Sequence, residues 1–292
     1  MLAPSPVVDA VMLESRAAGF AKRSFKRESK RAAIDLAIRC IDLTTLEGRD
    51  SPGRVRSLCA KAMSPAPGAP AVAAVCVYPN LVAIAKSALG SSGVKVASVA
   101  TAFPSGLSSL DVKLRDTEAA LIAGADEIDM VIDRGAYLAG DEATVFNEIQ
   151  AVKRLCGDVH VKAILEAGEL GSYDAIRHVS DIALEAGADT IKTSTGKIGI
   201  SATLPIALVM ATAIRDFARR TGERRGLKVA GGIRTSKSAF AYLALIDEIL
   251  GGDWLDPDFF RFGASSLLDD LLLQREKERT GRYASPDVIA KD

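Results

Sequence analysis

Short runs of apolar, often β-branched residues alternate along the chain with longer segments whose apolar residues recur at helical spacing. The short runs predict eight strands, at 38–41, 71–78, 94–102, 127–132, 160–166, 190–195, 226–230 and 259–263. The helical spacing predicts helices between them, for example over 110–123, 144–155, 173–185 and 204–219, and one earlier helix over 8–31. Alternation of this kind predicts parallel strands joined by helical crossovers.

The number of strands favours one fold of the α/β class. Eight parallel strands within 292 residues favour a closed (β/α)8 TIM barrel with an extra N-terminal helix over an open doubly wound sheet. We expect an N-terminal helical extension over 1–35, the barrel over 36–275 and a C-terminal tail over 276–292. The first strand is not followed by Gly-x-Gly-x-x-Gly, and the sequence has no Gly-x-x-x-x-Gly-Lys-Ser/Thr. Both nucleotide-binding interpretations are therefore weak.

The balance of charges argues against two classes of binding partner. The chain has 37 basic and 37 acidic side chains, so its formal net charge is zero. This balance argues against a surface for nucleic acid or anionic lipid. The apolar runs are all shorter than the roughly 20 residues that span a bilayer. The N-terminus lacks the basic start and apolar core of a secretory signal, so we expect a cytoplasmic protein with no membrane partner.

Cysteine and histidine usage argues against metal chemistry. The four cysteines include no Cys-x-x-Cys pair, which predicts reduced, mostly buried thiols rather than a disulfide framework or a zinc site. The two histidines, His160 and His178, are 18 positions apart and lack ligand-type spacing. We therefore expect no metal site, and the chemistry must come from other side chains.

Three lysines stand inside apolar strands. Lys162, Lys192 and Lys228 fall on the fifth, sixth and seventh predicted strands. Neighbouring strands are about 4.8 Å apart, so these ammonium groups would lower one another's pKa, and burial would add to the effect. A lysine made neutral in this way can attack a carbonyl and form a Schiff base. The spacing alone does not select the nucleophile, and an ion pair at the barrel mouth is the structural alternative for each lysine.

Two carboxylates are the natural counter-charges. Asp129 lies on the fourth predicted strand and Asp42 at the end of the first. Strand alternation puts Glu127 on the same face as Asp129. Asp129 is equally well interpreted as a general acid/base or as a salt-bridge partner of the lysines.

Small and polar residues follow the last three strands. In TIM barrels the loops at this position often bind phosphate together with a helix N-terminus. The alternative is that they are ordinary tight connections, in which Gly and Ser are common. The residues predicted to bind the phosphate are Thr195, Gly196, Lys197, Gly231, Gly232, Gly263, Ser265 and Ser266.

An ordered series of motifs resembles one enzyme family. The series is Asp-Leu-Thr-Thr-Leu at 42–46, Cys-Val-Tyr-Pro at 76–79, Glu-Ile-Asp-Met-Val at 127–131, Gly-Glu-Leu at 168–170, Ile-Lys-Thr-Ser-Thr-Gly-Lys at 191–197, Ala-Gly-Gly-Ile-Arg at 230–234 and Phe-Gly-Ala-Ser-Ser at 262–266. The set closely resembles the deoxyribose-phosphate aldolases from about Asp42 to Leu268. Val229 and Ala167 depart from the family pattern, which has Pro and Thr at these positions, but neither departure removes a catalytic group.

The resemblance implies a class I aldolase that needs no metal and no cofactor. It implies reversible cleavage of 2-deoxy-D-ribose 5-phosphate, a small phosphorylated sugar, to acetaldehyde and D-glyceraldehyde 3-phosphate. By motif position, Lys192 matches the Schiff-base lysine, and Lys228 matches the second lysine that perturbs it. Asp129 matches the carboxylate that relays protons, with Lys162 beside it. We also place Asp42 among the substrate-binding residues, and we regard a homodimer or a higher homo-oligomer as compatible with the sequence.

Two other functions compete with this interpretation. The first is another imine-forming aldolase, or a transaldolase, that acts on a different phosphorylated sugar. The second is a barrel that binds a phosphosugar for sensing or scaffolding without catalysis. Lys192, Lys228 and Asp129 argue against the second, because a silent barrel has no reason to keep costly buried charges.

Overall fold

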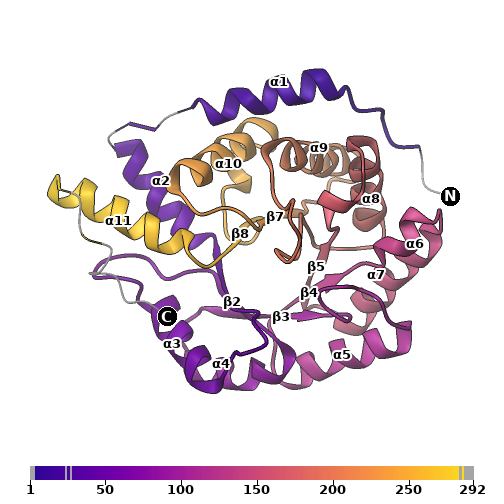
Figure 1. Cartoon of the computed structure of the whole chain (residues 1–292), viewed down its shortest axis with the longest axis horizontal. Helices are drawn as coiled ribbons and strands as arrows, with labels where there is room; N and C mark the ends of the chain where they lie inside the picture. The colour runs from indigo at the N-terminus through magenta and orange to yellow at the C-terminus, as the bar shows by residue number, and fades with distance from the viewer. Residues whose placement is uncertain (1–3, 24, 27, 283–284, 286–292) are drawn as a thin grey trace.

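Eight parallel strands close into a barrel, as predicted (Figure 1). The computed structural model describes residues 4–282 except 24 and 27, together with residue 285. Each strand pairs with the next along the chain, and β8 pairs with β1. The strands are β1 (Ile41–Thr44), β2 (Ala74–Val77), β3 (Lys95–Ala100), β4 (Glu127–Val131), β5 (His160–Ile164), β6 (Thr190–Lys192), β7 (Gly226–Ala230) and β8 (Phe260–Ala264).

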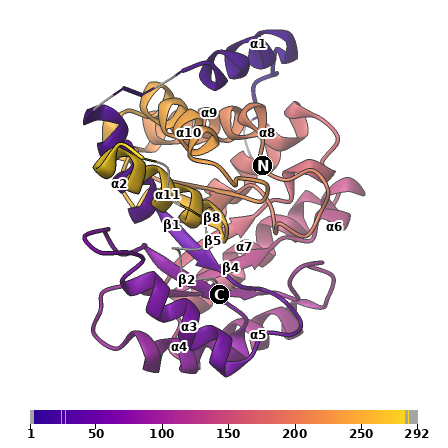
Figure 2. The ribbon, with the colours of Figure 1, turned by 60° about the vertical axis from the view of Figure 1, so that its left-hand side comes forward.

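Helices surround the barrel, and α1 lies outside the ring that they form (Figures 1 and 2). The helices are α1 (Ala10–Ala21), α2 (Glu28–Arg39), α3 (Pro52–Met63), α4 (Val82–Leu89), α5 (Leu110–Ile122), α6 (Arg134–Leu138), α7 (Glu142–Cys156), α8 (Tyr173–Glu185), α9 (Leu204–Thr221), α10 (Ser236–Ile249) and α11 (Leu267–Thr280). Three short 3-10 helices are η1 (Pro79–Leu81), η2 (Ala167–Glu169) and η3 (Gly252–Trp254). Within the described residues, every helix is too short or too polar to cross a membrane.

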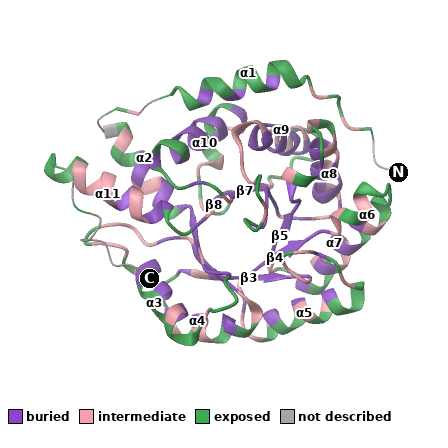
Figure 3. Ribbon diagram, in the orientation of Figure 1, coloured by how far each residue is buried: buried purple, intermediate pink, exposed green. Residues whose placement is uncertain are grey.

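The main apolar core lies between the strands and the helices, whereas the inside of the barrel combines buried charges with a small apolar cluster of Leu46, Cys76, Ala97 and Val99. On β4, Ile128 and Met130 belong to the apolar core that the helices cover. Glu127 and Asp129 alternate with them and point into the barrel, where they bind lysine and arginine side chains. Figure 3 shows the buried residues concentrated on the strands and on the barrel-facing sides of the helices. Strand alternation therefore separates packing on one face from charge on the other.

The first strand was predicted three residues too early. The chain is still helical at Ile38 and Arg39, and the N–H of Cys40 donates to the carbonyl of Leu36. A short apolar run does not distinguish a strand from the end of a buried helix. Here the run forms the last turn of α2, and β1 begins only at Ile41. The other seven strands overlap their predicted ranges.

The single helix predicted over 8–31 is wrong, because this segment contains α1 and the first part of α2. The two helices bury their apolar sides against different neighbours: α1 packs on α9 and α10, and α2 packs on α10 and α11. One straight helix cannot reach both surfaces. The predicted domain boundary at residue 35 lies inside α2, and the one after residue 275 lies inside α11. Most of the predicted tail after residue 282 is outside the described residues.

The contact of α1 with the barrel helices predicts a measurable stability. Phe20 is 1% exposed on α1, and Val11 on the same helix is 81% exposed. Phe20→Ala should lower the free energy of unfolding by about 3 kcal/mol, because it leaves a cavity. Val11→Ala, the matched control, should change it by less than about 0.5 kcal/mol. Urea unfolding followed by circular dichroism measures both. An unchanged main transition in Phe20→Ala would mean that α1 detaches before the barrel unfolds.

Candidate active site

The inside of the barrel holds a cluster of seven buried charged side chains, which we call the charge cluster. Four are cationic and three are carboxylates, and each is at most 5% exposed. They come from β1, β4, β5, β6, β7 and β8, so only the closed barrel brings them together. Its members are Lys162, Lys192, Lys228, Arg261, Asp42, Glu127 and Asp129.

Asp129 is the centre of the charge cluster. Its Oδ1 accepts a hydrogen bond of 2.8 Å from Lys162 Nζ. Its Oδ2 accepts bonds of 2.8 Å from Lys192 Nζ and 2.7 Å from Lys228 Nζ. All three predicted lysines therefore contact the same carboxylate. Burial alone would raise the pKa of Asp129, but the positive charge of the surrounding lysines outweighs it and holds this pKa well below its usual range.

The remaining carboxylates pair with cations deeper in the barrel. Glu127 Oε2 accepts a bond of 2.5 Å from Lys162 Nζ. Arg261 bridges two strands: its Nη1 donates to Asp42 Oδ1 at 2.6 Å and its Nη2 to Glu127 Oε1 at 2.8 Å. Lys228 also forms an ion pair with Asp42. Each carboxylate thus contacts at least two cations, which offsets the cost of burying it.

Charge counting distinguishes Lys192 from the other cations. If Lys162, Lys228 and Arg261 are charged, they balance the three carboxylates. A charged Lys192 would then leave one excess positive charge in a buried site. The pKa directions agree with this count. Burial lowers the pKa of Lys192 and the charge of Lys228 lowers it further, against the attraction of Asp129. For Lys162 and Lys228 burial also favours the neutral form, but the nearby carboxylates outweigh it and raise both pKa values.

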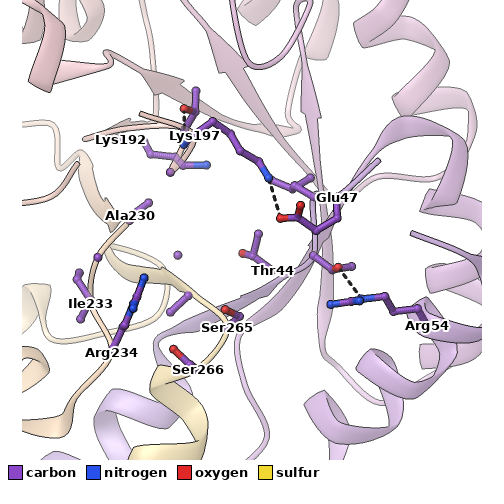
Figure 4. Close-up of a pocket in the computed structure, with 18 residues that line it drawn as sticks. Thr44, Glu47, Arg54, Lys192, Lys197, Ala230, Ile233, Arg234, Ser265 and Ser266 are labelled. Carbon is purple, nitrogen blue, oxygen red and sulfur yellow. Dashed lines mark hydrogen bonds and ion pairs between the residues drawn. The ribbon is translucent and has the colours of Figure 1, made fainter. Parts of the chain in front are cut away.

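The position of Lys192 in the barrel is also distinct. Of the seven charge-cluster side chains, only Lys192 lines the cavity of about 240 Å³ at the carboxyl ends of the strands. The cavity walls come from the segments after β1, β6, β7 and β8 (Figure 4). Lys192 lies beside Lys228 in the register of β6 and β7. Lys192 therefore contacts both the cavity and the buried charge cluster.

All eight residues predicted to bind phosphate line this cavity together with Lys192. Glycine is required at two of these positions for different reasons. Gly231 has a φ of +86°, and a Cβ there would lie 2.4 Å from Ser201 Cβ. A Cβ on Gly263 would lie 3.1 Å from Lys228 Cε and 2.8 Å from Ala230 Cβ. These glycines keep the cavity wall thin and leave room for Lys228.

Two details of the predicted site residues are visible only in the structure. Asp42, predicted among the substrate-binding residues, is fully buried and does not line the cavity, so its role toward the substrate stays a prediction. Its carboxylate is held by Lys228 and Arg261. Ser266 is the N-cap residue of α11, yet its side chain makes no capping hydrogen bond within the described residues. Its hydroxyl faces the cavity (Figure 4).

Sequence reasoning missed several residues of the site. Arg54, Glu47 and Arg234 line the cavity, and Arg261 completes the charge cluster. Arg261 stands between Phe260 and Phe262, so a charge within an aromatic strand was a usable signal, as it was for the lysines. Glu47 and Arg234 lie in polar loops and Arg54 lies in the first turn of α3, and in such places a charge does not stand out.

Glu166 was also missed, although it fixes the segment that follows Lys192. It is fully buried, and its backbone is left-handed with a φ of 52°. Its Oε1 accepts a hydrogen bond of 3.0 Å from Thr195 N, and its Oε2 accepts one of 2.5 Å from Thr195 Oγ1. The N–H of Lys197 donates in turn to Thr195 Oγ1 at 3.1 Å. Glu166 therefore orients one wall of the cavity from the neighbouring strand.

The four cysteines are free and buried, as predicted. Cys76 lies near Lys228, Asp129 and Lys192 of the charge cluster, and burial raises the pKa of its thiol. The raised pKa favours the neutral thiol, which packs inside the barrel, over a reactive thiolate.

Comparison with known proteins agrees with the geometry of the site. The model of the DeoC/LacD aldolase family matches residues 36–271. Deoxyribose-phosphate aldolase of Mus musculus is 45% identical over 278 residues, which cover 91% of this chain and 87% of that protein. The enzyme of Homo sapiens is 44% identical, with the same coverage. A solved deoxyribose phosphate aldolase from Aeropyrum pernix has a TM-score of 0.63 and 26% identity, covering 94% of this chain and all of its own.

The family match spans the whole barrel, from within α2 to within α11. It includes every member of the charge cluster and every residue that lines the cavity. The barrel, the buried lysines and these similarities lead to one conclusion: the chain belongs to the DeoC/LacD aldolase family.

Proposed function

We propose that this protein is a deoxyribose-phosphate aldolase that works through a Schiff base on Lys192. The reaction is the reversible cleavage of 2-deoxy-D-ribose 5-phosphate to acetaldehyde and D-glyceraldehyde 3-phosphate. The observation that carries the proposal is that Lys192 alone joins the buried charge cluster to the cavity. Its lowered pKa favours the neutral amine that a nucleophile requires.

Covalent catalysis starts at Nζ of Lys192. The neutral amine attacks the C1 aldehyde of the open-chain sugar, and loss of water gives a protonated imine. Asp129 Oδ2, 2.8 Å from this nitrogen, is positioned to move protons to and from it during these steps. The strongly lowered pKa of Asp129 makes it a weak base, so it releases each proton readily.

The protonated imine then accepts the electrons of the broken bond. A water held by Asp129 removes the proton of the C3 hydroxyl, and C3 becomes the aldehyde carbon of D-glyceraldehyde 3-phosphate. The electron pair of C2–C3 moves toward the imine nitrogen and leaves a neutral enamine on Lys192. Protonation at C2 and hydrolysis release acetaldehyde and restore the amine.

The two other lysines act without forming the imine. Lys228 remains charged because Asp129 and Asp42 raise its pKa, and its charge favours the neutral form of Lys192. Lys162 holds the other oxygen of Asp129 and so orients this carboxylate toward Lys192. Both are positioning residues in this proposal.

The phosphate would bind at the wall formed after β6, β7 and β8. Backbone N–H groups of the glycines, the N-terminus of α11 and the side chain of Lys197 surround this part of the cavity. Arg234 lines the same wall and supplies a second positive charge. Binding of this remote group would hold C1 of the sugar near Lys192.

The alternatives differ from this proposal in measurable ways. A transaldolase or an aldolase for another phosphosugar would prefer a different substrate in a panel of phosphosugars assayed for acetaldehyde. A barrel that only binds a phosphosugar would form no imine. The four relatives with about 45% identity all carry the deoxyribose-phosphate aldolase name, which favours the first choice.

Assembly, location and domain organisation complete the proposal. We infer a homo-oligomer, supported by the tetramer described for the relative from Aeropyrum pernix. The free, buried cysteines support a reducing compartment such as the cytoplasm. We retain residues 1–35 as an extension of the barrel and 276–292 as its tail, supported by the family match over 36–271.

Replacing the nucleophile should abolish the reaction and leave the fold intact. Lys192→Met removes the amine, and three cations still balance three carboxylates in its absence. Borohydride reduction with deoxyribose 5-phosphate, followed by peptide mass mapping, should place the adduct on Lys192 in the unmodified protein. Lys22→Met, at the exposed end of α1 outside the barrel, is the control and should retain the adduct. An active Lys192→Met variant, or an adduct on Lys162 or Lys228, would contradict the proposal.

Removing the neighbouring charge should shift the pH profile in a defined direction. Lys192 must be neutral to attack, so activity falls as the pH drops through its pKa. Because the charge of Lys228 lowers this pKa, Lys228→Leu should raise it and move the acidic limb of kcat/KM to higher pH. Lys228→Arg, which keeps the charge, is the matched control. An unchanged limb in a folded, active Lys228→Leu variant would mean that burial alone sets the pKa.

A carboxylate placed in the phosphate wall should distinguish phosphorylated from free sugar. Gly232→Glu should lower kcat/KM for deoxyribose 5-phosphate about tenfold by repulsion and spare unphosphorylated deoxyribose. Gly232 has a φ of +80° and open space around it, so Gly232→Ala controls for the backbone strain. Ser266→Ala should show a milder loss of the same kind. Equal proportional losses on both substrates would place the phosphate elsewhere.

A further inference from the structure

One acidic side chain stands in a cavity that is otherwise lined by neutral and cationic groups. Glu47, in the segment after β1, is the only carboxylate among the residues that line this cavity. The same cavity is lined by Arg54, Lys197 and Arg234. A carboxylate beside a phosphate site opposes the binding of the phosphate dianion. Its presence there therefore calls for a physical explanation.

Glu47 holds the lysine that the proposed function assigns to the phosphate. Its Oε1 accepts a hydrogen bond of 2.8 Å from Lys197 Nζ across the mouth of the cavity (Figure 4). The hydrogen bond and the charge of Lys197 lower the pKa of Glu47, so this carboxylate is ionised at neutral pH. Both side chains are partly exposed, Glu47 at 54% and Lys197 at 31%. A pair of this kind is weak enough for another anion to replace it.

We propose that Glu47 competes with phosphate groups for Lys197 and thereby weakens the binding of every phosphate-bearing ligand in this cavity. In the unliganded protein the lysine is occupied, and an incoming phosphate group must displace the carboxylate. Small free oxyanions gain only the contacts of the phosphate wall, whereas deoxyribose 5-phosphate is also held by its bond to Lys192. Glu47 thus lowers the occupancy of the site by inorganic phosphate. The inference rests on the proposed function, which takes Lys197 as a phosphate ligand.

The position of the pair supports this competition. Lys197 belongs to the segment that Glu166 fixes through Thr195, so its backbone is held in place while its long side chain is free to turn. Glu47 comes from a different segment, which Thr45 and Asp50 stabilise: Thr45 Oγ1 donates to Asp50 Oδ1 at 2.7 Å. The N–H of Glu47 donates to the other oxygen of Asp50 at 2.9 Å. Displacement therefore requires only a rotation of two side chains.

Direct binding of inorganic phosphate tests the inference without requiring turnover. Isothermal titration calorimetry compares the unmodified protein with Glu47→Gln, Lys197→Met and the double variant. Glu47→Gln should bind inorganic phosphate about fivefold more tightly, because it removes both the competitor and a like charge. The gain should disappear in the Lys197→Met background, since the competition acts through this lysine.

Steady-state kinetics supply the second measurement. Glu47→Gln should lower KM for deoxyribose 5-phosphate by a similar factor and leave kcat/KM for unphosphorylated deoxyribose unchanged. Glu276→Gln is the matched control, because Glu276 forms an exposed 2.6 Å pair with Arg279. That pair is roughly 15 Å along α11 from the cavity. The control should change neither the dissociation constant nor KM.

Three outcomes would overturn the inference. The first is an unchanged or weaker affinity of Glu47→Gln for phosphate. The second is an equal gain in the Lys197→Met background, which would make the effect one of general field rather than competition. The third is a parallel loss of kcat/KM on both sugars, which would mean that Glu47 contacts the sugar itself. Tighter phosphate binding by Glu47→Gln in a protein that cannot cleave deoxyribose 5-phosphate would support the inference and overturn the proposed function.

Discussion

The contact of Asp129 with the Nζ atoms of three lysines is the interaction on which the site depends. A carboxylate fully buried in a barrel is costly to ionise, and the charges of Lys162 and Lys228 beside it make ionisation favourable. Because Asp42 and Glu127 are held by cations as well, the charge cluster is balanced by three positive charges. The fourth cationic side chain, Lys192, is the one whose neutral form suits the balance. The balance of buried charges thus accounts both for the ionisation of the carboxylates and for the reactivity of Lys192.

The closed barrel brings the seven side chains of the charge cluster together. Parallel strands bring residues that are far apart in sequence to the same level, as with Lys192 and Lys228 in the register of β6 and β7. Closure of β8 on β1 brings Arg261 to Asp42 across 219 positions. The charge cluster then lies beneath the cavity, and the loops above it supply the anion-binding groups. The inside of the barrel therefore sets the protonation state of Lys192, and the loops at its rim recognise the substrate.

Much of this site could be predicted from the sequence, because a lysine within an apolar strand is visible without a structure. The three lysines, Asp129 and the residues after the last three strands were predicted to lie together, and they do. Pairings that depend on barrel closure were not predicted, such as the hydrogen bond from Arg261 to Asp42. Glu47 was missed because its meaning depends on Lys197, 150 positions away. The first strand was misplaced because local pattern does not separate a buried helix end from a strand.

The electrostatic balance has a consequence for the order of events on Lys192. A neutral amine leaves the charge cluster balanced, but a protonated imine adds a positive charge 2.8 Å from Asp129 and beside Lys228. The extra positive charge raises the energy of the protonated imine relative to the neutral amine. Breaking the C2–C3 bond sends an electron pair to that nitrogen and returns the barrel to neutrality. The repulsion built up on forming the imine is relieved as the carbon–carbon bond breaks, so the charges of Lys162 and Lys228 favour this step without contacting the bond.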